Sequence, residues 1–168
     1  MRILFFLQSL NQGGSERNVS DLAHGLERRE HHVAIAAVHE IGVHWQQVLD
    51  PHSLPVSIFF RDTPGNALSA AYQLVGAARK LRHLLQAERI ETLYCTGGPV
   101  APVVGWLATV NLPAVRLIWN LLALPGRPPW HQDLRLALLR RFRILVSPTV
   151  PLLISCSEAV QALSLIHI

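Results

Sequence analysis

The strongest constraint on this chain is the alternation of short apolar runs with longer segments of helical periodicity. Residues 3–7 form a continuous apolar run, and a Gly-Gly pair follows a few residues later. Such a run is typical of a strand buried on both faces of a parallel sheet. Ser15 can cap the helix that follows. The spacing predicts the buried stripe of that helix at Val19, Leu22, Ala23 and Leu26.

The same alternation continues along the chain. Further strands are predicted at 32–38, 55–60, 92–95, 114–120 and 152–156, and further helices at 66–87, 100–110, 131–145 and from Ser157 onward. The apolar side of the second helix is predicted at Leu68, Tyr72, Val75, Ala78, Leu81 and Leu85. Strands that alternate with helices in this way predict an α/β fold, a Rossmann-like parallel sheet with helices on both faces.

Composition narrows the class of protein. With 168 residues, half of them hydrophobic and 15% charged, the chain is long enough for one domain and too apolar to be disordered. The net charge of +4 is compatible with nucleic acid, an anionic membrane surface or phosphorylated substrates. The chain has no basic tail and no zinc-finger spacing, so we expect no nucleic-acid partner. Two cysteines cannot form a disulfide framework.

Residues 92–115 contain no charged side chain and are long enough to span a bilayer. Pro99, Pro102 and Pro113 interrupt this segment, which is better interpreted as a strand, a loop and a helix. The N-terminus lacks a small-residue cleavage site, so no signal peptide is predicted. We expect a cytoplasmic protein, with peripheral membrane contact as a further hypothesis.

The loops after the strands are the candidate binding site, because ligands of open α/β sheets bind beyond the carboxyl ends of the strands. Gly13 and Gly14 lead into a helix N-terminus, which can present amides to a diphosphate or can be a tight turn without a ligand. Gly97 and Gly98 form a second glycine turn at the same edge. Asn120 ends the fifth strand, where it can orient a substrate hydroxyl or form a turn.

Other chemistries find little support in the sequence. The chain has neither the dinucleotide fingerprint nor the P-loop motif, and no nucleophile elbow. Its nine histidines show no metal-binding spacing, so we expect no metal and no cofactor. On helix 131–145, three arginines project away from the apolar arc and form either a lipid-binding face or a solvated one: Arg135, Arg140 and Arg143.

Several segments together carry a family resemblance. Four segments occur in the order and spacing of family 4 glycosyltransferases: the strand at 1–10, the run Gly13-Gly14-Ser15-Glu16-Arg17, the run His31-His32-Val33 and the segment 153–160. The chain resembles the N-terminal half of such an enzyme, which has the GT-B architecture of two Rossmann-like domains facing across a cleft.

The resemblance implies residue roles and domain boundaries. Residues 1–163 would be the acceptor-side domain and residues 164–168 a truncated or scar-bearing end, with the C-terminal donor-binding domain absent. The amides of Gly13 and Gly14, with Ser15, would face the donor diphosphate. Asn120 stands where many members have a catalytic histidine. Glu30 stands where the family often has glycine, so a left-handed helix cap is less expected there.

The leading hypothesis is a sugar transferase that uses a nucleotide-sugar donor and a glycan or lipid-linked acceptor, with retained anomeric configuration. The chain alone would be inactive, because half of a cleft cannot position both substrates. One alternative is a non-catalytic α/β module that binds a phosphorylated ligand. Another is an oligomeric scaffold that covers its unfinished edge with a second copy.

Overall fold

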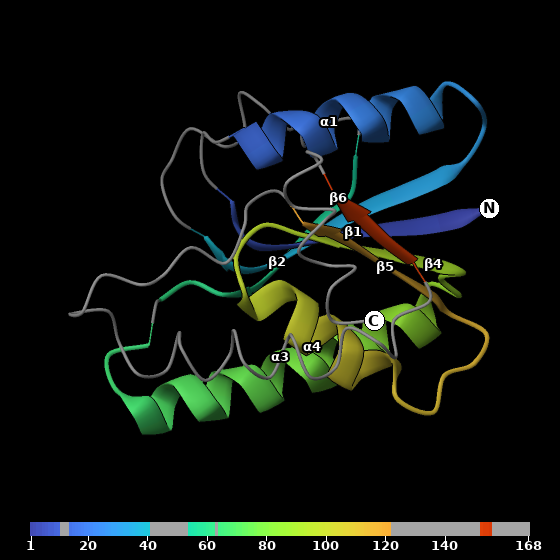
Figure 1. The fold of residues 1–168 in the computed structure, drawn as a ribbon. Coiled ribbons are helices and arrows are strands. Elements are labelled where there is room, and N and C mark those ends of the chain that lie inside the picture. Colours follow the sequence, from blue (N-terminus) through green and yellow to red (C-terminus); the bar gives the residue numbers. More distant parts are fainter. Residues whose placement is uncertain (11–13, 41–53, 63, 122–151, 156–168) are drawn as a thin grey trace.

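A computed structural model of the chain describes residues 1–10, 14–40, 54–62, 64–121 and 152–155 (Figure 1). The strands are β1 (Arg2–Leu10), β2 (His32–Glu40), β3 (Val56–Phe60), β4 (Thr92–Thr96), β5 (Arg116–Leu121) and β6 (Leu152–Ser155). The helices are α1 (Gly14–Glu27), α3 (Ala67–Ala87) and α4 (Val100–Thr109). These elements agree with the predicted ones to within a few residues. The helices predicted at 131–145 and from Ser157 lie outside the described residues.

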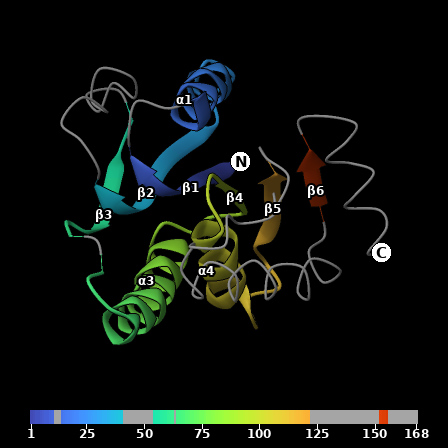
Figure 2. The ribbon, with the colours of Figure 1, turned by 60° about the vertical axis from the view of Figure 1, so that its left-hand side comes forward.

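The six strands form one parallel sheet in the order β3-β2-β1-β4-β5-β6. The chain builds outward from β1 through β2 to β3, and then crosses back to place β4 on the other side of β1. Figure 2 shows α1 on one face of the sheet and α3 and α4 on the other. The predicted Rossmann-like fold with helices on both faces is therefore confirmed.

Each face of the sheet has its own hydrophobic core, because successive side chains of a strand point to opposite faces. Beneath α1 the core contains Ile3, Phe5, Leu7, Val19, Ala23, Val33, Ile35 and Tyr94. Beneath α3 and α4 it contains Leu4, Phe6, Leu81, Leu85, Leu93, Cys95, Val104 and Trp119. The central strand β1 contributes to both cores, which explains its continuous apolar sequence.

The predicted helix stripes are partly wrong. In α1, Leu22 is exposed rather than buried. In α3, the predicted stripe begins with three exposed residues, Leu68, Tyr72 and Val75, whereas the helix packs through Ala77, Leu81 and Leu85. In α3 the physical reason is angular drift, because each residue advances about 100° around a helix. The predicted stripe takes three consecutive steps of three residues between Tyr72 and Leu81, which places these two side chains about 180° apart.

The end of α1 corrects the expectation for Glu30. This residue adopts a left-handed conformation, with φ of 62°. The amide of His31 donates to the carbonyl of Leu26 at 3.1 Å, and the amide of Glu30 donates to that of Glu27 at 2.8 Å. This is the Schellman pair of hydrogen bonds, which usually places glycine at the left-handed position. The cap forms without glycine, because its two hydrogen bonds offset the strain at Glu30.

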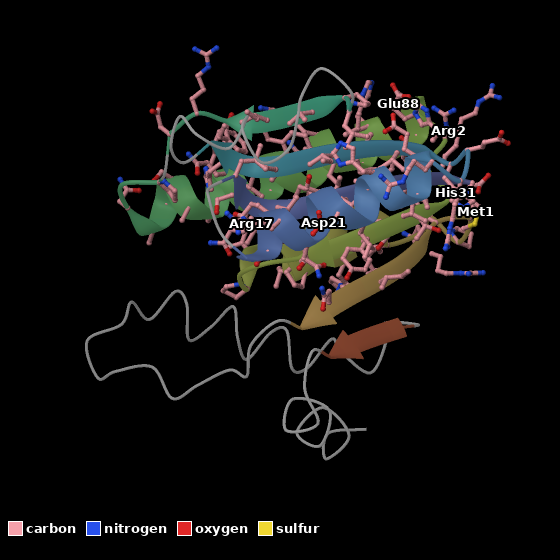
Figure 3. All side chains as sticks on the ribbon, turned by 90° about the horizontal axis from the view of Figure 1, so that it is seen from above. Met1, Arg2, Arg17, Asp21, His31 and Glu88 are labelled. Carbon is pink, nitrogen blue, oxygen red and sulfur yellow. The ribbon has the colours of Figure 1, made fainter. Side chains whose placement is uncertain are left out.

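The amino edge of the sheet is held by an ion pair. Arg2 on β1 contacts Glu88 at the end of α3, with 3.0 Å between Nη2 and Oε2, and its Nε donates to the Glu88 carbonyl. In Figure 3, Arg2 and Glu88 lie at the same end of the molecule as Met1 and His31, whereas Arg17 marks the other end of α1. The opposite, carboxyl edge is therefore the one that carries the glycine loops.

Candidate functional site at the carboxyl edge

A cavity of about 260 Å³ lies at the carboxyl edge, where the chain direction across the sheet reverses between β1 and β4. This reversal is the topological switch point, the place where open α/β sheets bind ligands. The end of β1, the first turn of α1 and the loop after β4 form its walls. The lining residues are Leu7, Gln8, Ser9, Ser15, Glu16, Gly97 and Gly98.

The first turn of α1 forms one wall of this cavity. The helix begins at Gly14, one residue before the predicted capping residue, so Ser15 lies inside the first turn. Gly14 is exposed, and a Cβ at this position would meet no atom within 4 Å. Gly14 thus begins the fourteen-residue helix at the positive end of the helix dipole. Gly13 lies outside the described residues.

Glu16 is a cavity residue that the sequence analysis did not propose. Its side chain is only 7% exposed, although it carries a carboxylate, and it lies in the first turn of α1. A carboxylate at a helix N-terminus is stabilised by the dipole. The carboxylate of Glu16 therefore lies in the wall of the cavity, beside the end of the helix.

Gln8 is a second cavity residue that the sequence did not point to, and its position explains why residue 98 is a glycine. The amide of Val100, the first residue of α4, donates to Oε1 of Gln8 at 3.2 Å. A Cβ on Gly98 would lie 2.0 Å from that same oxygen. Glycine at position 98 is therefore required for the Gln8 side chain to reach α4. Gly97 is needed for a different reason, its φ of 91°, which L side chains rarely adopt.

Asn120 lies near the end of β5 and is buried. It is not among the residues that line the cavity. Its side chain hydrogen-bonds Tyr94 on the neighbouring strand β4. Burial raises the pKa of Tyr94, and the hydrogen bond with Asn120 acts in the opposite direction. The described geometry thus gives Asn120 a partner within the sheet, one strand away from the cavity wall.

The structure therefore brings together three of the predicted site residues: Ser15, Gly97 and Gly98. The predicted lipid-facing arginines Arg135, Arg140 and Arg143 lie outside the described residues. Within the described ranges, no cluster of three or more His, Cys, Asp or Glu side chains is arranged to hold a metal ion. In those same ranges, no helix combines the length and the apolar character needed to cross a membrane. Residues 92–115, the long uncharged segment, form β4, α4 and the start of the connection to β5.

The strand order defines a Rossmann-like domain, and the cavity at its switch point is the candidate ligand site. The chain belongs to a glycosyltransferase family, because it matches the family described as "Glycosyl transferase 4-like domain" over residues 13–164. This match confirms the resemblance to family 4 glycosyltransferases. No curated protein matches the chain.

Solved structures share the fold at low sequence identity. A putative UDP-N-acetylglucosamine 2-epimerase from Listeria monocytogenes has a TM-score of 0.69 at 13% identity, over 98% of this chain and 42% of that one. MurG from Acinetobacter baumannii has a TM-score of 0.63 at 14% identity, over 92% of this chain and 41% of that one. MnaA from S. aureus, in a co-structure with UDP, has a TM-score of 0.68 at 12% identity, over 98% of this chain and 41% of that one. The chain therefore spans less than half the length of each of these structures.

Proposed function

We propose that this chain is the acceptor-side half of a glycosyltransferase that moves a sugar from a nucleotide-sugar donor to a glycan or lipid-linked acceptor with retained anomeric configuration. The observation that carries this proposal is the cavity at the switch point, which is lined by the predicted site residues Ser15, Gly97 and Gly98 in a chain that matches a glycosyltransferase family. The structure of MnaA, a protein similar in fold, contains UDP, which supports a nucleotide-sugar donor.

The charges at the site suggest how two substrates would share it. The exposed N-terminus of α1 at Gly14 would face the donor diphosphate, because amides and the dipole favour an anion there. We therefore assign the diphosphate to the solvent side of Gly14 and sugar hydroxyls to the cavity.

Catalysis is proposed to need a second domain that binds the donor. Positioning both reactants supplies a large share of the rate enhancement of an enzyme. Asn120 has an amide where many family members have histidine, and an amide is a weaker proton-transfer group than imidazole. We therefore propose that Asn120 orients Tyr94 and does not transfer a proton. Because a donor-binding domain is needed as well, we propose that residues 1–168 alone do not transfer sugar.

The test is a titration of the ¹⁵N-labelled protein with UDP or GDP, followed by NMR. The amide signals of Gly14 and Ser15 should shift, and that of Gly25 near the other end of α1 should not. Gly14→Ala should weaken the response, whereas Gly25→Ala should leave it unchanged; neither new Cβ meets an atom within 4 Å. No shift at Gly14 with millimolar nucleotide would remove the diphosphate role. An equal response to inorganic phosphate would favour the phosphate-binding module instead.

A further inference from the structure

The side of α1 that is turned away from the sheet carries a pattern of charged and apolar side chains that the proposed function does not use. We call it the α1 outward face and define it by five residues: Asp21, Leu22, Gly25, Leu26 and Arg28. Each residue advances about 100° around a helix, so Asp21 and Arg28 lie about 40° and 60° to one side of Gly25. Leu22 and Leu26 lie about 60° and 100° to the other side. The face therefore has a charged flank and an apolar flank, with a glycine between them.

The α1 outward face is accessible in the described domain. Asp21, Leu22 and Arg28 are exposed, and Leu22 is the large apolar side chain that α1 exposes, at 40%. A Cβ added to Gly25 would meet no side chain of another element within 4 Å. A hollow of about 650 Å³ lies over the face, and the described residues that line it belong to α1 or to the turn that ends it. Figure 3 looks down on α1 and shows Asp21 on this outward side.

The two charges of the face have no ionic partner among the described residues. The helical turn continues to Arg28, whose amide donates to the carbonyl of His24 at 3.1 Å. Asp21 and Arg28 are seven residues apart, which is about 10 Å along the axis, whereas side chains of one helix pair at a spacing of three or four residues. Asp21 and Arg28 of one copy are therefore too far apart to neutralise each other.

We propose that the α1 outward face joins two copies of this chain in an antiparallel helix pair, with a two-fold axis beside Gly25. A two-fold axis perpendicular to both helices reverses the direction of the second helix and keeps like flanks together. On the charged flank, Asp21 of each copy then lies opposite Arg28 of the other. On the apolar flank, Leu22 of each copy lies opposite Leu26 of the other. The face is thus complementary to itself in both charge and polarity.

The same pattern disfavours other arrangements and other partners. A parallel pair would bring Asp21 against Asp21 and Arg28 against Arg28, and like charges in an interface are costly. A uniformly acidic partner would repel Asp21, and a uniformly basic one would repel Arg28. The reversed copy of the same helix presents both charges in the required order. Gly25 at the crossing favours this contact, because the distance between packed helices depends on the side chains where they cross.

The size and place of the face define what kind of dimer is expected. A standard interface buries about 800 Å² on each partner, and one side of a single helix offers less, so the dimer should be weak and dependent on concentration. In an antiparallel pair, the two helix N-termini lie at opposite ends. The candidate cavities beside these N-termini would therefore lie far apart, and both would stay accessible. The inference rests on α1 alone and does not depend on transferase activity.

The test is sedimentation equilibrium of the purified protein from micromolar to millimolar concentration. The unaltered chain should show a monomer–dimer equilibrium. Asp21→Arg or Arg28→Glu should each weaken it about 25-fold, because two symmetric contacts turn from attraction to repulsion, at about fivefold each. Both side chains are exposed, so these changes should preserve the circular dichroism spectrum.

Charge exchange makes the test specific. An equimolar mixture of the Asp21→Arg and Arg28→Glu proteins should form a dimer again, because each contact then joins opposite charges. The combined variant Asp21→Arg, Arg28→Glu should also dimerise by itself. Two matched reversals of exposed charges should leave the equilibrium unchanged: Glu27→Arg on another side of α1, and Arg79→Glu on α3. A monomer at millimolar concentration, equal losses in these controls, or a mixture that stays monomeric would overturn the proposal.

Discussion

Gly98 is the position where a single methyl group tests the geometry of the candidate site. In Gly98→Ala, the new Cβ would lie 2.0 Å from Oε1 and 2.8 Å from Cδ of Gln8. The end of a glutamine side chain moves more easily than backbone, so we expect the Gln8 amide to leave its place. It then loses the 3.2 Å hydrogen bond from the Val100 amide. The N-cap residue Pro99 offers no side-chain hydrogen bond in its place.

The magnitude follows from the lost cap. Removing a side-chain hydrogen bond at a helix N-terminus costs about 1 kcal/mol. Gly98→Ala should therefore lower the free energy of unfolding by about 1 kcal/mol, measured by urea denaturation. Gln8→Ala should cause a similar loss, because it removes the same hydrogen bond.

The double variant Gln8→Ala, Gly98→Ala provides the decisive comparison. With Gln8→Ala in place, the three atoms nearest to a Cβ at position 98 are removed, since all three belong to the Gln8 side chain. Gly98→Ala should then lower the free energy of unfolding by less than about 0.5 kcal/mol more. The double-mutant cycle should therefore show a coupling energy of about 1 kcal/mol between positions 8 and 98. Gly25→Ala on α1, where a Cβ meets nothing within 4 Å, should destabilise in neither background. Additive losses from Gly98→Ala and Gln8→Ala would refute the steric reasoning.

Three further predictions concern stability. Glu30→Gly should raise the free energy of unfolding in urea by about 0.5 to 1 kcal/mol, because it relieves the left-handed conformation of an L residue; an unchanged value would contradict the strain. Gly105→Ala should lower the free energy of unfolding by about 1 to 3 kcal/mol, because its Cβ would lie 2.3 Å from Sγ of buried Cys95. That loss should disappear in the Cys95→Ala background. Burial lowers the pKa of His39 in the folded state below its usual value of 6.5. The contribution of neutral His39 to the free energy of unfolding is therefore complete above about pH 6.5, and it is lost as the pH falls through the folded-state pKa. His39→Gln should therefore flatten the acid limb of a plot of unfolding free energy against pH, and an unchanged limb would contradict this.

The elements of the fold were predictable because they rest on local patterns. Strands with apolar runs buried on two faces, such as 3–7 and 92–95, stand out without knowledge of their neighbours. The side of α3 that packs was not predictable in the same way. Leu68, Tyr72 and Val75 have a helical spacing that fits a core, and only the position of the sheet shows that they face outward.

The candidate site was predictable in its place but not in its composition. The glycine pairs after β1 and β4 indicate a site at the carboxyl edge, since parallel strands end together there. Gln8 and Glu16 gave no such signal, because a polar residue in a strand or in a first helical turn is ordinary. Their importance follows from contacts across 92 residues of sequence, between Gln8 and Val100, and from the burial of a carboxylate.

Local physics in the amino-acid sequence determined the class of this protein: alternating strands and helices, glycine loops at one edge, and the motifs of its family. Tertiary structure alone decided which glycine makes room for which side chain and which helix surface stays exposed. The reason is the range of the forces involved. Backbone preference and apolar periodicity act over a few residues, whereas steric fit and burial depend on segments that meet only after the sheet has formed.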